Sequence, residues 1–207
     1  MMRRLLSRPV FILGASLLVL GGCVGQSQPS RFYVLNSLAT SETGRRLAAA
    51  ENRIAIGIGP LELPKYLDRS QIVTRASPNQ LDLADFDKWA EPLQDNFSRV
   101  LAENLSILLS TDRVVMFPWG TTPIDYQVAA EVTRFESQPG GDVAMDARWT
   151  VFGKDRKALV MKQSSFSEPV GAEGYEAIVS ALSRALATLS RDIAAAIQAH
   201  SQRIADR

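Results

Sequence analysis

The stretch from Tyr126 to Gln163 constrains the fold more strongly than any other part of the chain. Apolar and polar side chains alternate along residues 126–132 and again along 143–151, and a shorter apolar run covers 158–163. A period of two is typical of strands that bury one face and expose the other to water. Turn-forming residues separate the three runs. The stretch is therefore predicted to be an antiparallel meander with one wet face.

Two other stretches have the period of an amphipathic helix. Apolar side chains recur every three or four residues from Trp89 to Leu109 and from Tyr175 to Gln198. We expect the first helix to begin near Ala90, with Asp87 as its N-cap and Pro92 in its first turn. The second helix is expected to end near Gln198.

The remaining runs predict a single domain. Short strands are expected at residues 32–35, 54–58, 71–75, 81–86 and 114–117. The predicted fold is an α/β (α+β) domain over residues 31–200, with a mostly antiparallel sheet and two long amphipathic helices packed on one face. Residues 201–207 are expected to form a frayed tail.

The first 23 residues differ in character from this domain. Three arginines precede an uncharged apolar run, Val10–Leu20, which is too short to span a bilayer because spanning takes about 20 residues. The run suits the core of an export signal. Leu20-Gly21-Gly22-Cys23 resembles a bacterial lipobox, which implies cleavage before Cys23 and acylation of its thiol. We expect residues 1–22 to be a lipoprotein signal peptide. The alternative is an ordinary signal peptide with a cysteine near its cleavage site.

Removal of the signal changes the charge balance. The remaining 185 residues carry 20 basic and 22 acidic side chains, which gives no electrostatic basis for binding nucleic acid. Residues 23–30 are expected to be the acylated cysteine and a polar linker, whose seven residues 24–30 reach about 25 Å at most. Val24 is not the aspartate that retains many enterobacterial lipoproteins in the inner membrane. That resemblance favours a lipid anchor in the outer membrane, with the domain facing the periplasm.

Residues suited to catalysis or metal binding are scarce. One cysteine and one histidine exclude an internal disulfide, a Cys/His zinc cage and a His-based triad with a free cysteine. The histidine, His200, is interpreted as a solvated side chain. The carboxylate pairs Asp85/Asp87 and Asp142/Asp146 are interpreted as a helix cap and a wet strand face. We therefore predict a non-enzymatic protein with no metal and no cofactor other than the covalent lipid on its cysteine.

One segment has no counterpart in these patterns: Pro64-Lys65-Tyr66-Leu67-Asp68-Arg69 follows a strand and begins with a proline. Together with Trp89-Ala90-Glu91-Pro92-Leu93 and the opening Arg31-Phe32-Tyr33-Val34-Leu35, it resembles the PqiC/YmbA family. These are ABC-type transport auxiliary lipoproteins, which accompany MCE-domain proteins in systems that move lipids between the inner and outer membranes of Gram-negative bacteria. Val132-Thr133-Arg134-Phe135-Glu136 matches the family's central hairpin in outline.

The resemblance implies a non-enzymatic periplasmic domain, anchored by lipid, that is a partner of an MCE-domain protein. Pro64, Tyr66, Leu67, Asp68 and Arg69 are the candidate partner interface, although the same residues could instead pin a loop to the core. Two other functions are open: a lipid carrier with a cavity between helices and sheet, and a lipoprotein regulator of cell-envelope synthesis. Unpaired strand edges also leave a homo-oligomer open.

Overall fold

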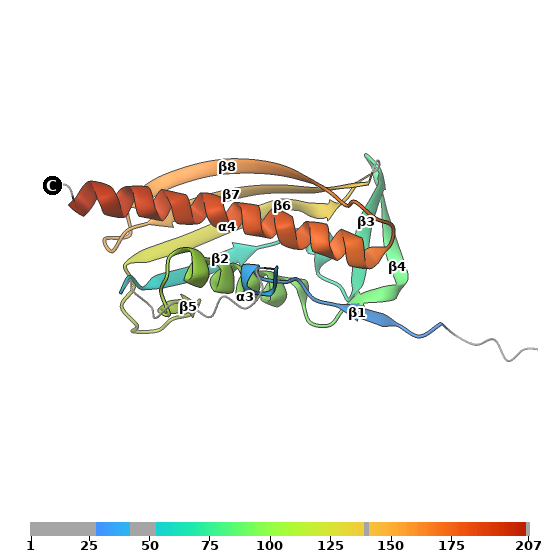
Figure 1. The fold of residues 1–207 in the computed structure, drawn as a ribbon, viewed down its shortest axis with the longest axis horizontal. Coiled ribbons are helices and arrows are strands. Elements are labelled where there is room, and N and C mark those ends of the chain that lie inside the picture. The colour runs from blue at the N-terminus through green and yellow to red at the C-terminus, as the bar shows by residue number, and fades with distance from the viewer. Residues whose placement is uncertain (1–27, 42–52, 139–140, 206–207) are drawn as a thin grey trace, which may run out of the picture.

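The structure, a computed structural model, describes residues 28–41, 53–138 and 141–205 (Figure 1). The predicted signal peptide and Cys23 therefore lie outside the described residues. The elements in chain order are β1 (Arg31–Tyr33), α2 (Leu38–Ser41), β2 (Ile56–Glu62), η1 (Lys65–Leu67), β3 (Gln71–Ser77), β4 (Gln80–Trp89), α3 (Leu93–Leu108), β5 (Val114–Met116), β6 (Tyr126–Ser137), β7 (Asp142–Phe152), β8 (Ala158–Pro169) and α4 (Tyr175–Ala205).

The strands form one mixed sheet. Its order is β1-β4-β3-β6-β2-β5, and β7 and β8 continue from β6. The ladders β6–β7 and β7–β8 are long and antiparallel, which confirms the predicted meander. In contrast, β2 runs parallel to both of its neighbours, β5 and β6, because long excursions of the chain separate these strands.

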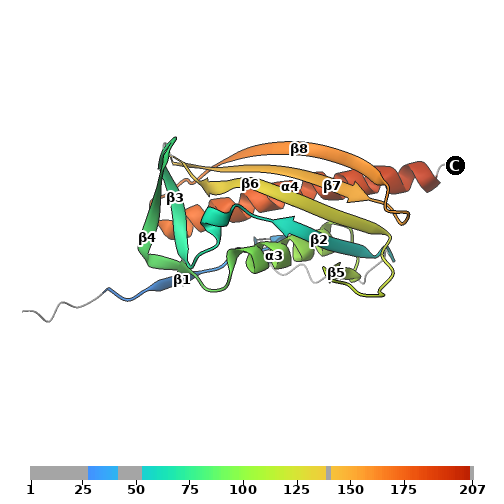
Figure 2. The ribbon, with the colours of Figure 1, turned by 180° about the vertical axis from the view of Figure 1, so that it is seen from behind.

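Both long helices pack on the same face of the sheet, as predicted. Figure 1 shows α4 in front of β6, β7 and β8 with α3 beside it, and Figure 2 shows the same layers from behind. The α+β fold is thus confirmed. The layer between helices and sheet is filled by large side chains, each of which is at most 2% exposed: Ile56, Ile58, Phe97, Leu101, Leu105, Phe135, Met145, Trp149, Leu182, Leu186 and Leu189. Burial of this apolar surface is the main source of stability.

The start of α3 differs from the prediction. Trp89 is the last residue of β4, where its backbone N–H donates to the Ser70 carbonyl at 2.7 Å. The helix begins only at Leu93, because Pro92 has a non-helical ψ of 128° and its carbonyl accepts from the first turn. Asp87 is consequently a strand residue, and its predicted role as N-cap is wrong. Trp89 is nevertheless buried in the core.

The end of α4 also differs from the prediction. The helix continues through Ala205, so the expected fraying after His200 is wrong for that part of the tail. Tyr126 on β6 accounts for the extension, because its hydroxyl lies 2.8 Å from the Ser201 hydroxyl and its ring packs edge-on against His200 at 5.9 Å. His200 is therefore half-buried against the sheet rather than fully solvated.

A buried carboxylate fixes the edge strand β1. Asp87 on β4 is 3% exposed, and both its oxygens accept from the Arg31 guanidinium at 2.8 Å. The Tyr33 hydroxyl donates to the same carboxylate at 2.7 Å. The hydrogen bonds from Arg31 lower the pKa of Asp87 below its usual value. Two of the three residues of β1 therefore hold one carboxylate of its neighbour.

This interaction predicts a specific pH dependence of stability. A carboxylate whose pKa is lower in the folded chain stabilises the fold above its unfolded pKa of about 3.9, and this contribution is lost as pH falls through the folded pKa. We expect Asp87→Asn to lower the free energy of unfolding at neutral pH, and the difference from wild type to shrink below about pH 4. Urea titrations between pH 7 and pH 3 measure it.

Asp85→Asn is the matched control, because Asp85 lies two residues earlier on the same strand and is exposed. It should leave the free energy of unfolding nearly unchanged. A difference for Asp87→Asn that stays constant down to pH 3 would contradict the role of the ionised carboxylate.

Candidate interaction site

The predicted interface segment, Pro64–Arg69, forms a tight turn after β2. Its middle residues are the 3-10 turn η1, in which the Leu67 N–H donates to the Pro64 carbonyl at 2.9 Å. The Arg69 guanidinium donates to the Tyr66 carbonyl at 2.8 Å and closes the turn from outside. Proline at the start and these internal hydrogen bonds hold the segment in one conformation.

The structure divides the predicted interface residues into two groups. Leu67 is buried and Tyr66 half-buried, so these two side chains fasten the turn to the core. Asp68 and Arg69 are exposed and Pro64 is half-exposed. A partner that approaches the turn would therefore contact Asp68 and Arg69 first.

Below the turn lies a carboxylate that no water reaches. Glu136 on β6 is 0% exposed. The Tyr66 hydroxyl donates to its Oε2 and Arg75 on β3 donates to its Oε1, each at 2.5 Å. Arg134 adds a second positive charge, with its Nε 3.6 Å from Oε1. These four side chains, which we call the Glu136 network, join η1, β3 and β6.

A β-bulge places Glu136 in this position. The pairing of β6 with β7 shifts by one residue between Val132 and Arg134, so Thr133 is extra. Phe135 then points into the core, where its ring meets Phe97 on α3 at 5.3 Å. Its neighbour Glu136 points to the opposite face of the sheet, beneath η1 and β3.

Sequence reasoning missed this network, although a signal was present. Unbroken alternation from Tyr126 onward would direct Arg134 and Glu136 toward the apolar core and Phe135 toward water. Polar residues at core positions of a strand indicate either a bulge or a buried polar network. Here both occur. Burial, and next the hydrogen bond to Glu136, raise the pKa of Tyr66, so its hydroxyl stays a donor at physiological pH.

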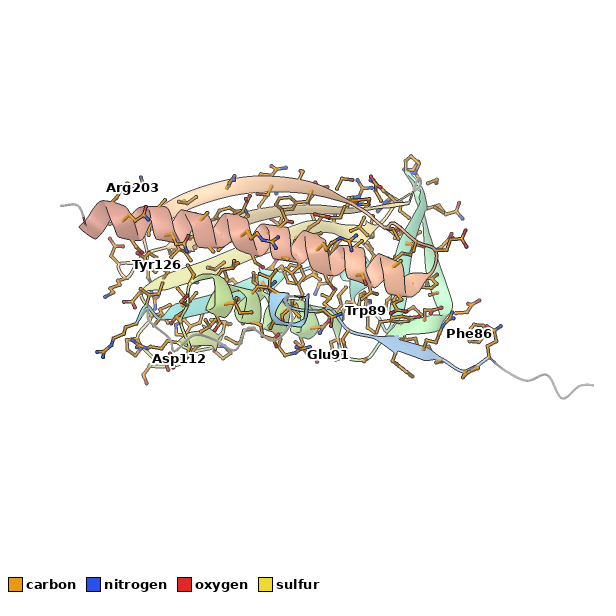
Figure 3. All side chains as sticks on the ribbon, viewed as in Figure 1. Phe86, Trp89, Glu91, Asp112, Tyr126 and Arg203 are labelled. Atoms are coloured by element: carbon orange, nitrogen blue, oxygen red, sulfur yellow. The ribbon has the colours of Figure 1, made fainter. Side chains whose placement is uncertain are left out.

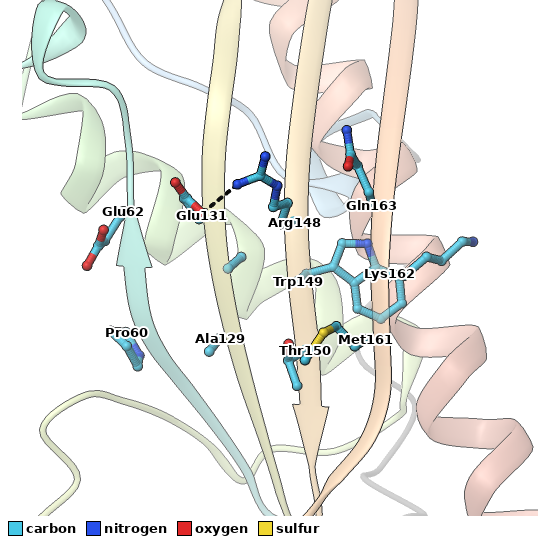
Figure 4. Close-up of a pocket in the computed structure, with 11 residues that line it drawn as sticks. Pro60, Glu62, Ala129, Glu131, Arg148, Trp149, Thr150, Met161, Lys162 and Gln163 are labelled. Carbon is cyan, nitrogen blue, oxygen red and sulfur yellow. Dashed lines mark ion pairs between the residues drawn. The ribbon is translucent and has the colours of Figure 1, made fainter.

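The face of the sheet turned away from the helices carries a shallow hollow. Figure 4 shows that it crosses β2, β6, β7 and β8, with Pro60 and Met161 at opposite sides. Met161 is 78% exposed. The Arg148 guanidinium lies 3.5 Å from the Glu131 carboxylate across the floor. No sequence pattern had singled out this surface, because most of its residues belong to the outward half of alternating strands.

Members of the carboxylate pairs considered for catalysis lie in different environments. Asp87 is engaged by Arg31 while Asp85 is exposed. Asp142 accepts from the Ser167 hydroxyl at 3.0 Å on the neighbouring strand. In the described ranges, no group of three or more His, Cys, Asp or Glu residues is arranged to hold a metal ion. Within those ranges there is also no helix with the length and apolarity needed to cross a bilayer.

The chain matches a known family. The family model of the ABC-type transport auxiliary lipoprotein component matches residues 33–194, from the end of β1 to the last turns of α4. The chain belongs to this family. The PqiC/YmbA resemblance is thereby confirmed, and the chain is an auxiliary lipoprotein component of a transport system.

Individual relatives agree with this assignment. The intermembrane transport lipoprotein PqiC of Escherichia coli K12 is 24% identical over 164 residues, which cover 79% of this chain and 83% of that protein. A crystal structure of an uncharacterised protein aligns with a TM-score of 0.67 at 20% identity, over 82% of this chain and 99% of its own. The protein XCC0632 of Xanthomonas campestris aligns with a TM-score of 0.62 at 16% identity, over 83% and 99%. These two structures share the fold.

The Glu136 network predicts the effect of removing one hydroxyl. Tyr66→Phe leaves a buried carboxylate with one donor fewer, so we expect the free energy of unfolding to fall by about 1–3 kcal/mol. Chemical denaturation measures the change. Tyr175→Phe is the control, because Tyr175 is similarly half-buried and its hydroxyl has no hydrogen-bond partner among the described residues. It should cost less than about 0.5 kcal/mol. Equal losses in the two variants would contradict the network.

Proposed function

We propose that this family member is a non-enzymatic lipoprotein, anchored in the outer membrane through Cys23, that docks an MCE-domain periplasmic protein of its transport system at the membrane. The match of residues 33–194 to the auxiliary lipoprotein family carries the proposal. The name of the E. coli relative, an intermembrane transport lipoprotein, agrees with such a role. Docking would be a contact between proteins, and the acyl chains would supply location.

The Pro64–Arg69 turn supports docking by the way it is built. Its exposed residues, Asp68 and Arg69, stand on a turn whose other side is held by Leu67 and by the Tyr66–Glu136 hydrogen bond. A preorganised surface loses little conformational entropy when a partner binds. Arginine beside a rigid apolar base is also a residue type that often dominates the binding energy of an interface.

The filled interior favours docking over the carrier alternative. A carrier needs an apolar cavity large enough for an acyl chain, and such cavities are commonly several hundred Å³. Here the layer between helices and sheet is occupied by side chains such as Phe97, Leu105 and Leu186, each 0% exposed. An open groove of about 910 Å³ lies between α3 and β2, but charged residues that include Asp95, Arg99 and Glu103 line it. The apolar residues of both helices are thus used to build the core.

The anchor gives the first test. Cys23→Ser removes the thiol that the lipobox resemblance assigns to acylation, so we expect the protein to leave the outer-membrane fraction and to keep its signal peptide. Fractionation and mass spectrometry of the purified protein measure both effects. An unmodified Cys23 in the wild-type protein would contradict the anchor.

The turn gives the second test. The double substitution Asp68→Ala with Arg69→Ala should weaken binding of the full chain to the MCE-domain protein of the same organism by at least about tenfold, which is about 1.4 kcal/mol. Surface plasmon resonance measures the affinity, and thermal unfolding should change little, because the hydrogen bond from Arg69 to the Tyr66 carbonyl is exposed to solvent. Arg191→Ala is the matched control, because Arg191 is an exposed arginine on α4. If the folded wild-type protein binds no MCE-domain protein, docking itself is contradicted. If all variants bind equally, only the role of the Pro64–Arg69 turn in docking is contradicted.

A further inference from the structure

The short strand β1 and the residue that follows it present two apolar side chains to the outside. The alternate residues are engaged: Arg31 and Tyr33 bind Asp87, and Leu35, just beyond the strand, is 2% exposed. The residues between them point the other way, as alternation requires. Phe32 is 64% exposed and Val34 is 41% exposed, although both are large and apolar.

These side chains belong to one end of the molecule. The sheet order begins with β1, so among the described strands none pairs with its outer edge, and its one neighbour is β4. Leu83 on β4 is a further large apolar residue, 45% exposed. Figures 1 and 2 show β1 and β4 at the end opposite the C-terminus of α4, and Figure 3 places Phe86 of β4 at the same end, far from Tyr126.

The predicted lipid anchor is attached to this same end. Phe32 and Val34 follow Cys23 by nine and eleven residues. A fully extended chain of nine residues reaches about 30 Å, and a relaxed one much less. Helix α4, with 31 residues, is about 46 Å long, so the far end of the domain lies well beyond that reach. An acylated Cys23 therefore keeps the β1 end close to the lipid surface, whereas the linker does not confine the far end.

The charges at this end favour an apolar contact over an electrostatic one. Arg31 is neutralised by Asp87, and Asp82 and Asp85 on β4 are exposed carboxylates. Burial raises the pKa of Tyr175 at the start of α4, and neighbouring carboxylates that include Asp82 and Asp85 add to the rise, which places these negative charges together. Lys88, the register partner of Phe32 on β4, offsets one of these carboxylates, so the charges give anionic lipids no net attraction here. Aromatic and branched apolar side chains, in contrast, partition into the boundary of headgroups and acyl chains.

We propose that the outward surface of β1 and of the residue after it, formed by Phe32 and Val34, is a membrane-contact surface that enters the lipid bilayer holding the acylated Cys23. This proposal rests on the lipid anchor of the proposed function, and it goes further because it orients the domain. The β1 end faces the bilayer, while α4 carries the opposite end of the domain into the periplasm. The contact adds a second attachment to the anchor and restricts rotation of the domain on its linker.

Spin labels on the full acylated chain test the proposal. Phe32→Cys and, as the matched control, Met161→Cys place a label on two large exposed side chains, of which Met161 lies on the open sheet face. In phosphatidylethanolamine–phosphatidylcholine vesicles, the label at position 32 should lose accessibility to a water-soluble nickel complex and gain accessibility to oxygen. The label at position 161 should keep its accessibility to nickel. Added phosphatidylglycerol should not deepen the label at position 32.

A second variant excludes an effect of the label itself. Leu83→Cys carries the label while Phe32→Ser and Val34→Ser remove the two apolar side chains, which point outward and should leave thermal unfolding unchanged. Shielding of the label at position 83 from nickel is expected with Phe32 and Val34 present and should be lost without them. Equal nickel accessibility at positions 32 and 161 would overturn the membrane-contact surface. Mass spectrometry distinguishes failure of the membrane-contact surface from failure of the lipid anchor. An unmodified Cys23 would contradict the anchor, whereas an acylated Cys23 with an accessible label at position 32 would contradict only the contact surface.

Discussion

The arrangement of the two parts of the sheet, the β3–β4 hairpin with β1 and the meander of β6, β7 and β8, depends on the burial of Glu136. An ionised carboxylate without water costs several kcal/mol unless charges and hydrogen bonds compensate it. Arg75, Arg134 and Tyr66 supply that compensation from three different segments. Backbone pairing between β3 and β6 is minimal, with one register pair between Thr74 and Ser137 among the described residues. The side chains of the Glu136 network therefore join the β3–β4 hairpin to the meander, together with the burial of Ile72 and Val73 in the shared core.

A second buried carboxylate continues the same construction outward. Asp87 attaches β1 to β4 through Arg31 and Tyr33, and β4 is attached to β3 by an antiparallel ladder. The chain that follows β1 also enters the main core directly, because Leu35 is buried there and its backbone N–H donates to Asn96 on α3 at 2.7 Å. Both interface proposals lie on this half of the sheet, with the Pro64–Arg69 turn fixed by Glu136 and the outward face of β1 fixed by Asp87. The helices and the meander form the packed core, and both proposed contact surfaces lie near the β3–β4 hairpin.

Much of the fold was predictable because local patterns and tertiary packing agree there. The buried faces of β6 up to Val132 and of β7 follow simple alternation, and both long helices have continuous apolar stripes. The predictions failed where a local pattern has two structural solutions. Trp89 suits both the end of a buried strand and the first turn of an amphipathic stripe. The hydrogen bond from its backbone N–H to the carbonyl of Ser70, which precedes the neighbouring strand β3, decides for the strand. Similarly, α4 extends past Gln198, where Tyr126 on another element contacts its last turns.

The sequence predicted which segment forms the candidate site, but not how its side chains are arranged. The residues of the Pro64–Arg69 turn were identified by their motif, but the motif does not state which of them face water. That division arises because Tyr66 reaches a carboxylate 70 positions away, which a bulge at Thr133 has turned out of the core. By itself the sequence determined the family, the layered α+β class and the absence of a second histidine or cysteine, since these follow from residue identity and local period. Only the tertiary structure decided which polar side chains are buried and which apolar ones remain exposed, because that depends on contacts between residues far apart in the chain.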